Sequence, residues 1–304
     1  MRHRRRVFAS SLTVAALTAA CGDAGSEPPP DPEPIRWVDV RLGSIGGCAR
    51  TNQGHVRCWG DLLEGAGIPE APFEPLDDTL AISVGTTLCA LSDRGVLRCL
   101  GGGSAEGIPS RVEGVTGVAS GFNSGCYQRV DGSADCWGFE DSTPPPEVFT
   151  KVTSGGRQAA GLTEDGRLLQ WGERPIRGLI DRASYQNVEI GGGLILCGHR
   201  EDDGTLDCVG DHADNAPTEA VHRLFPASSG GMCAELEANG QVVCWARDNF
   251  MTGVDPIADV PPGIDFITVA PYFSGACGLT TEHELVCWGS EVAGEFDIPD
   301  LPTE

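Results

Sequence analysis

The feature of this sequence that most limits its fold is a short segment, bounded by two cysteines, that recurs along the chain. In CARTNQGHVRCWG, residues 48–60, the two cysteines lie ten positions apart around a polar run. Successive copies start at intervals of 34 to 44 residues. A period of this size indicates a repeat architecture in which each copy packs against its neighbours. The copies begin at Cys48, Cys89, Cys126, Ala160, Cys197, Cys233 and Cys277.

The two cysteines of each copy are expected to form a disulfide. The one copy that lacks the first cysteine, at Ala160, also lacks the second, at Gln170, and joint loss is what a bonded pair predicts. Zinc ligands usually occur as C-x-x-C or with closely spaced histidines, and neither arrangement is present. The alternative is buried free thiols. The predicted pairs are Cys48–Cys58, Cys89–Cys99, Cys126–Cys136, Cys197–Cys208, Cys233–Cys244 and Cys277–Cys287.

The spacing also predicts a β-hairpin. If Cys48 faces Cys58 across an antiparallel pair, Asn52, Gln53 and Gly54 remain as the loop. The third residue of such a loop commonly adopts a left-handed backbone, which costs glycine least. Glycine also ends the next five loops, and only the last copy departs, with His283 at this position.

A further strand is expected before each hairpin. Its signature is an apolar residue, a β-branched residue three positions later and a glycine three positions after that, as in Trp37, Val40 and Gly43. Three short strands cannot bury both faces of a sheet, whereas seven such sheets stacked around an axis can. The residue after the first cysteine is small in six copies, which predicts close approach of neighbouring sheets. The tryptophans after the second cysteines are interpreted as core residues: Trp59, Trp137, Trp171, Trp245 and Trp288.

The pattern CAL-x-x-x-G-x-x-x-CWG, preceded by V-x-x-G, resembles the repeats of the regulator of chromosome condensation family, in the cysteine-bearing form found in exported bacterial proteins. The resemblance covers Arg36 to Pro299. The short period is similar to that of the secreted bacterial β-lactamase-inhibitor propeller of this superfamily. The resemblance implies an all-β fold, a seven-bladed β-propeller. It carries over no inhibitor contacts residue by residue, and a fold does not define a function.

The N-terminus predicts export. Residues 1–20 combine an arginine-rich start with a short apolar run and small residues, as in a bacterial signal peptide. The ending TAAC resembles a lipobox, which predicts lipidation of Cys21; the alternative is an ordinary secretory signal cleaved near Ala20. Residues 21–34 are acidic and proline-rich and predict an extended tether. Residues 35–304 then form the propeller, and we expect a cell-envelope lipoprotein, with the outer membrane favoured, or a secreted protein.

Charge limits the possible partners. The formal net charge is −23, and an acidic surface of this size repels phosphate backbones. We therefore expect a monomer that binds a protein or a cell-surface polymer, not nucleic acid. Contact with a membrane is expected only through the lipid anchor.

No constellation predicts catalysis or a cofactor. The histidines beyond the signal peptide are scattered, and no G-x-S-x-G, H-E-x-x-H or phosphate-loop motif occurs. The acidic segment 201–214 offers oxygen ligands for calcium, although its spacing fits no standard calcium loop. We expect a non-enzymatic binding or scaffold propeller. The alternative is a propeller lyase or hydrolase acting on an envelope polysaccharide or peptide.

The sequence also suggests where a partner would dock. If the strands of a repeat alternate in direction, the hairpin loops form one face of the ring, the turn face. The other face, the loop face, is formed by the loops before each first cysteine and by the start of the longer segment that leads from the third strand of one repeat to the next repeat. The turn loops resemble one another, whereas the loop-face segments differ and carry large side chains that predict partner binding. Alternatively, several of them plug the channel. These residues are Phe122, Arg157, Ile195, Tyr272, Phe273, Leu62, Phe139 and Phe250.

Overall fold

The computed structural model describes residues 33–43, 46–60, 78–101, 107–173, 176, 184–192, 195–227, 231–246, 259–272, 275–289 and 300–301. The chain divides into a unit of residues 1–34 and a unit of residues 35–304, and the fold below is that of the second unit. Within the described ranges, no helix has both the length and the apolar character needed to span a bilayer.

The second unit consists of seven antiparallel sheets, called blades 1 to 7 in chain order. The strands of each blade follow one another in the chain. Blade 1 contains β1 (Trp37–Gly43), β2 (Gly46–Thr51) and β3 (Val56–Gly60), and blade 2 contains β4 (Thr79–Val84), β5 (Leu88–Ser92), β6 (Val96–Leu100) and β7 (Val112–Glu113). Blade 3 contains β8 (Val115–Gly121), β9 (Ser124–Arg129) and β10 (Ala134–Trp137), blade 4 contains β11 (Phe149–Gly155), β12 (Gln158–Thr163) and β13 (Leu168–Gly172), and blade 5 contains β14 (Tyr185–Gly191), β15 (Ile195–Arg200) and β16 (Leu206–Gly210). Blade 6 contains β17 (Val221–Pro226), β18 (Gly231–Leu236) and β19 (Val242–Ala246), and blade 7 contains β20 (Phe266–Tyr272), β21 (Gly275–Thr280) and β22 (Leu285–Gly289). A single turn of 3-10 helix, η1 (Ala213–Asn215), is the only helical element among the described residues.

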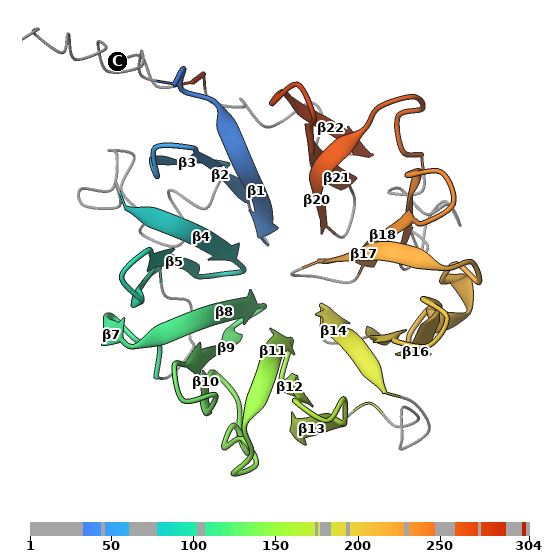
Figure 1. The fold of residues 1–304 in the computed structure, drawn as a ribbon. Coiled ribbons are helices and arrows are strands. Elements are labelled where there is room, and N and C mark those ends of the chain that lie inside the picture. Colours follow the sequence, from blue (N-terminus) through green and yellow to red (C-terminus); the bar gives the residue numbers. More distant parts are fainter. Residues whose placement is uncertain are drawn as a thin grey trace, which may run out of the picture. The chain divides into compact units, whose positions relative to one another are not determined.

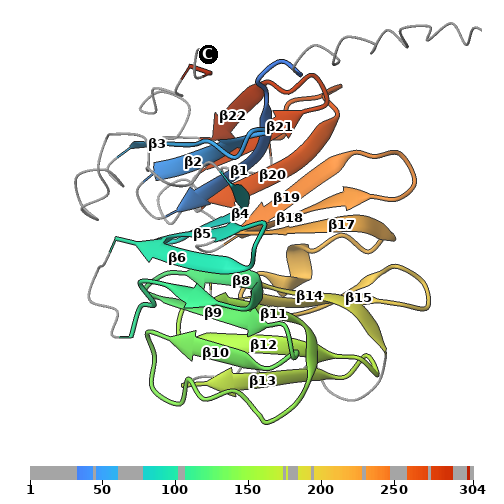
Figure 2. The same cartoon turned by 60° about the vertical axis from the view of Figure 1, so that its left-hand side comes forward.

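The blades form a ring around a central axis (Figure 1). The first strand of each blade lies nearest the axis, and the second and third strands lie further out. Figure 2 shows successive blades stacked face against face. The predicted all-β fold, a seven-bladed β-propeller, is therefore confirmed.

Apolar packing occurs between blades. The buried apolar side chains form seven clusters, and each cluster combines residues of two adjacent blades. Between blades 6 and 7, for example, Phe225 and Cys233 pack with Phe266 and Trp288. Because every sheet lies between two neighbours, both of its apolar faces are removed from water.

Hydrogen bonds also connect neighbouring blades. The backbone N–H of Phe149, at the start of blade 4, donates to the carbonyl of Gly132 in the hairpin turn of blade 3 at 2.9 Å. The carbonyl of Phe149 accepts a hydrogen bond from the Gln128 side chain of the same preceding blade. Similar bonds from turn glycines join blades 2 and 3, 4 and 5, and 5 and 6, so the blades are held in a fixed register.

All six predicted disulfides are present. Cys48 lies directly opposite Cys58 in the hairpin, with their Cα atoms 4.0 Å apart, and the other five pairs have the same arrangement. In blade 4, Ala160 lies opposite Gln170 at the position that the cysteines occupy elsewhere. Each hairpin is thus closed locally, by residues within one repeat.

The hairpin turn of blade 7 keeps a left-handed backbone although histidine replaces glycine at this position. His283 has a φ of +65°, close to the φ of +73° at Gly95 in blade 2. The His283 Nδ1 lies 2.8 Å from the carbonyl oxygen of Trp37 in blade 1, a bond that glycine cannot make. The strain of a left-handed non-glycine residue is thus accompanied by a contact that joins the last blade to the first.

The small residues after the first cysteines divide into two groups. Ala49, Ala90 and Ala234 pack in clusters shared with an adjacent blade, as predicted, whereas three glycines contact their own blade. A Cβ atom at Gly161 would lie 2.4 Å from the ring of Phe149, which belongs to the same blade. Gly198 and Tyr185 in blade 5, and Gly278 and Phe266 in blade 7, repeat this contact. These three glycines therefore make room for an aromatic ring of their own blade. The tryptophans are buried core residues, as predicted.

Among the described strands, none is shared between the first and the last blade where the ring closes. The three strands of blade 1 and those of blade 7 are each consecutive in the chain. Trp37, Val40 and Trp59 of blade 1 pack with Ala270 and Leu279 of blade 7, and Arg41 Nη1 donates to Thr268 Oγ1 at 3.3 Å. Closure therefore depends on face packing between the first and last blades.

We expect a seventh disulfide, made by Ala160→Cys together with Gln170→Cys, to stabilise the protein. The two positions oppose each other as the cysteine pairs of the other blades do. Restricting an eleven-residue loop in the unfolded chain contributes about 2–3 kcal/mol. Denaturant unfolding of the oxidised double variant should show this gain, and each single variant should not. An oxidised double variant no more stable than the wild type would contradict the prediction.

Candidate functional site

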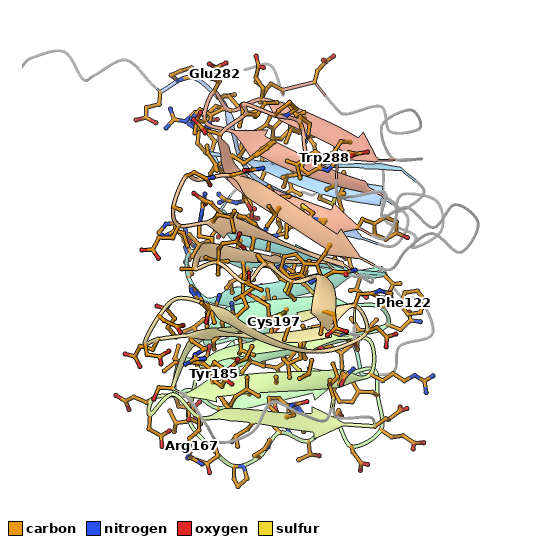
Figure 3. All side chains as sticks on the ribbon, turned by 90° about the vertical axis from the view of Figure 1, so that its right-hand side faces the viewer. Phe122, Arg167, Tyr185, Cys197, Glu282 and Trp288 are labelled. Carbon is orange, nitrogen blue, oxygen red and sulfur yellow. A yellow bond between two sulfur atoms is a disulfide. The ribbon has the colours of Figure 1, made fainter. Side chains whose placement is uncertain are left out.

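The loop face carries two of the predicted binding residues as exposed side chains. Phe122 lies in the turn between β8 and β9 and is 49% exposed. Arg157 lies in the turn between β11 and β12 and is exposed, with its guanidinium 2.9 Å from the Glu173 carboxylate. Figure 3 shows Phe122 on the opposite side of the ring from Arg167 and Glu282, which lie at the hairpin turns. The loop face is therefore the side with an exposed aromatic residue.

Two other predicted residues are half-buried. Tyr272 ends β20 and packs against the cluster between blades 7 and 1, and this burial raises the pKa of its hydroxyl above the ordinary value. Phe139 follows β10 and packs against the cluster between blades 3 and 4. Both side chains contribute to the ends of inter-blade cores as well as to the surface.

The prediction that Ile195 contacts a partner is wrong. Ile195 is 3% exposed and belongs to the cluster between blades 5 and 6. It is the first residue of β15, and its side chain points between the sheets instead of away from them. Leu62, Phe250 and Phe273 lie outside the described residues, as does the predicted lipidation site Cys21.

Glycines allow the first strands to converge at the loop face. A Cβ atom at Gly85 would lie 2.1 Å from the carbonyl oxygen of Gly121, and one at Gly43 would lie 2.2 Å from that of Gly85. The corresponding position is Gly155 in blade 4 and Gly191 in blade 5. The backbones of the first strands of blades 1 to 4 are thus in direct contact at this end of the ring, and only glycine fits between them.

A cavity of about 610 Å³ lies along the first strands. Side chains alternate along a strand. The fourth residues Val40 and Val188 are buried between blades, whereas third and fifth residues such as Asn187 and Glu189 line the cavity. These positions were not recognised from the sequence, although the spacing of Trp37, Val40 and Gly43 would have located them.

Charged pairs line this cavity. Lys151 of blade 4 contacts Glu189 of blade 5 and donates to Asn187 at 2.7 Å, and Thr153 donates to Glu189 at 3.3 Å. Arg41 lies 3.3 Å from Asp39. Arg223 of blade 6 bonds the carboxylate of Glu235 and, in blade 7, the carbonyl of Phe266 at 2.9 Å. The Lys151–Glu189 pair joins two blades, the Arg223–Glu235 pair joins two strands of blade 6, and the Arg41–Asp39 pair lies within β1.

Blades 2 and 3 present only uncharged residues to the same cavity. Their lining residues include Ala81, Ser83 and Ala119. A Cβ atom at Gly117, in register with Ala81, would meet no atom closer than Gln128 Oε1 at 3.8 Å. Gly117 is therefore not required by packing, and this part of the wall leaves space for the charged residues opposite.

One histidine of the cavity wall is buried. His199 is 4% exposed, and its Nε2 lies 3.0 Å from the Gln186 amide nitrogen. Burial lowers the pKa of His199 below its ordinary value, and hydrogen bonds with the backbone of Gly204 and Val221 act in the opposite direction. Because Val221 starts blade 6, the imidazole joins blades 5 and 6.

The described residues show no metal-binding constellation. No three His, Cys, Asp or Glu side chains converge within the described ranges. In the acidic segment considered for calcium, Asp202 pairs with Arg200 at 2.8 Å and Asp203 accepts from Thr205 Oγ1 at 2.6 Å. These carboxylates are engaged in contacts within their own loop.

Solved structures provide neighbours at low sequence identity. The CRINKLY WD40 ectodomain of the Arabidopsis thaliana receptor kinase ACR4 is 19% identical, with a TM-score of 0.66 over 87% of this chain and 100% of that chain. The ectodomain of the Physcomitrella patens receptor kinase CR4 is 19% identical, with a TM-score of 0.67 over 84% and 74% of the two chains. Prp20p of Saccharomyces cerevisiae, the yeast RCC1, is 13% identical, with a TM-score of 0.57 over 77% and 80%.

The chain has an RCC1-like propeller fold. At these identities the likeness concerns the fold alone. Neither a scan against protein families nor a search of curated proteins finds a match. The expected relation to the exported bacterial, inhibitor-like form stays a prediction.

We expect Gly85→Ala to destabilise the ring by about 2 kcal/mol or more, because its Cβ would overlap the backbone of the next blade. Gly117→Ala is the matched control, since its Cβ enters open space; its stability should be unchanged or higher by up to about 1 kcal/mol. Denaturant unfolding measures both changes. Equal stability of the two variants would contradict this account of the glycines.

We expect the free energy of unfolding to fall as the pH drops below about 6.5, the ordinary pKa of histidine. Because the pKa of His199 is lower in the folded state, the unfolded chain binds the proton more readily. The neutral imidazole thus stabilises above the unfolded pKa, and this contribution is lost as the pH falls toward the folded one. Nearby Glu237 opposes the lowering and His222 adds to it.

The test compares denaturant unfolding at about pH 7.5 and about pH 5.5. His199→Gln cannot titrate and should show a smaller acid loss than the wild type. His222→Gln, at an exposed position, is the control and should retain the loss. An unchanged acid loss in His199→Gln would show that other groups cause it.

Proposed function

We propose that this protein is a non-enzymatic binding propeller that docks a protein partner on its loop face. The observation that carries the proposal is Phe122, a large aromatic side chain exposed on that face. Exposed aromatic residues contribute strongly to binding when a partner covers them. The polymer partner considered from the sequence is the other outcome of the test below.

The turn that carries Phe122 is held in place. Thr86 of blade 2 donates to Asn123 Oδ1 at 3.0 Å, and the Asn123 backbone N–H donates to Thr86 Oγ1 at the same distance. Asn123 has a φ of +54°, a left-handed conformation that asparagine tolerates. A residue fixed in this way loses little conformational entropy on binding, which favours affinity.

Comparison supports a protein as the partner. The structure of Prp20p is described with its binding to Gsp1p and histones, and a second structure holds yeast RCC1 bound to Kap60. Propellers of this fold thus serve as protein-binding scaffolds. The acidic composition of the present chain favours a partner other than nucleic acid.

The contacts in the cavity favour binding over catalysis. Glu189 is bonded to Lys151 and Thr153, and His199 contacts Gln186 and backbone groups, so neither side chain is paired as an acid or base with a nucleophile. A hydrolytic site needs such groups to converge on one reacting atom. We therefore retain the non-enzymatic assignment.

The six disulfides indicate an oxidising compartment. We infer that the chain is exported by its N-terminal signal and anchored in the cell envelope through lipid on Cys21. The acidic, proline-rich residues 21–34 would then connect the anchor to the ring.

We expect Phe122→Ala to weaken capture of the partner from a cell-envelope extract by at least about tenfold. Its melting temperature should stay unchanged, because the side chain is already exposed. Val130→Ala is the matched control, since Val130 is 73% exposed near the hairpin turn of blade 3. Capture that survives Phe122→Ala, or that is lost in Val130→Ala, would assign binding to another surface.

A further inference from the structure

We propose that the central cavity is a binding site for a small organic anion with two or more carboxylate or phosphate groups. The proposal does not depend on the loop face. It rests on which charges reach the cavity, how they are held and how much space lies between them.

In each of three ion pairs the cation is the more exposed partner. The exposed fractions of the side chains are 39% for Arg41 against 11% for Asp39, and 35% for Lys151 against 10% for Glu189. The third pair, Arg223 and Glu235, has 37% against 17%. All three cations line the cavity, whereas Glu189 is the only acidic residue among its lining residues. A protein of net charge −23 thus presents mainly positive groups along its axis.

The cations are held in position before any ligand binds. Lys151 also contacts Asn187 at 2.7 Å, and Arg41 also contacts Thr268 at 3.3 Å. Donors fixed in this way avoid much of the entropy cost of ordering a long side chain on binding. A partly enclosed site also strengthens their attraction for an anion relative to open water.

The positions of the three cations and the size of the cavity together favour small ligands that carry several negative charges. The cations come from blades 1, 4 and 6, so one ligand must carry more than one anionic group to contact several of them. The small residues Ala81, Ser83 and Ala119 provide room, and about 610 Å³ lies within the range of small-molecule sites. The acidic composition of the chain disfavours long polyanions, which leaves small ones as the ligand class.

The test is calorimetric titration of the folded protein with citrate, with glucose 1,6-bisphosphate and with glucose as the uncharged control. We expect saturable, salt-sensitive binding of at least one anion and none of glucose. Comparing citrate with the phosphate ester distinguishes the two anionic chemistries. Absence of saturation by both anions up to about 10 mM, or equal binding of glucose, would overturn the proposal.

Variants locate the binding. Lys151→Gln should weaken it about tenfold, because a charge-assisted hydrogen bond is lost. Glu189→Gln should tighten it about threefold, because the competing carboxylate is neutralised while the side chain keeps its shape. Arg94→Gln, at a side chain that is 81% exposed in the turn face, is the matched control and should have no effect.

If Lys151→Gln fails to fold, Glu189→Gln still tests whether the anion binds in the central cavity. Weaker anion binding in Glu189→Gln, or binding that responds to Arg94→Gln instead, would place the anion elsewhere. Melting temperatures measured with each variant separate a loss of binding from a loss of structure.

Discussion

Each blade has two apolar faces, and a sheet of three short strands cannot cover either of them by itself. The neighbouring blades provide the cover, so each cluster of buried apolar side chains lies at an interface between two blades. The first and last blades have the same requirement. Packing of Trp37 and Val40 against Leu279 closes the ring because it removes the last two apolar faces from water.

Disulfides within the blades fix the register of the hairpins, so packing between blades does not have to fix it alone. A disulfide such as Cys48–Cys58 fixes the register of a hairpin before its neighbours are in place. Blade 4 has no disulfide and keeps the same register between Ala160 and Gln170. Its aromatic pair, Phe149 and Trp171, lies with ring centroids 5.4 Å apart in the buried cluster between blades 3 and 4. Packing alone therefore suffices for the geometry of one blade.

The ring provides two chemically different surfaces. At the loop face, convergence of the first strands at glycines such as Gly85 and Gly121 brings neighbouring turns close together, and the turn with Phe122 lies among them. Along the axis, several third and fifth residues of the first strands, such as Lys151 and Glu189, line the cavity instead of an inter-blade cluster and are free to vary in type. Lys151 and Glu189 exploit this freedom, since their charges are balanced across a blade interface instead of within a sheet.

The sequence by itself determined the number of repeats, the hairpins and the pairing of the cysteines. These features depend on residues ten or eleven positions apart, whose contacts follow from strand register and turn geometry. The position after the second cysteine of each repeat also located the core tryptophans correctly. The role of glycines such as Gly161 was missed, because the contact with Phe149 depends on how side chains of two paired strands pack.

Only the tertiary structure decided which corresponding side chains are exposed. Phe122 and Ile195 both lie close to the loop between a first and a second strand, yet one is 49% exposed and the other 3%. The charged lining of the cavity likewise joins distant residues, such as Arg41 and Thr268, which are 227 positions apart. Repeat spacing predicts that such residues share a level of the ring. Whether a side chain is buried, and which charged groups it contacts, depends on the adjacent blade and on how the ring closes.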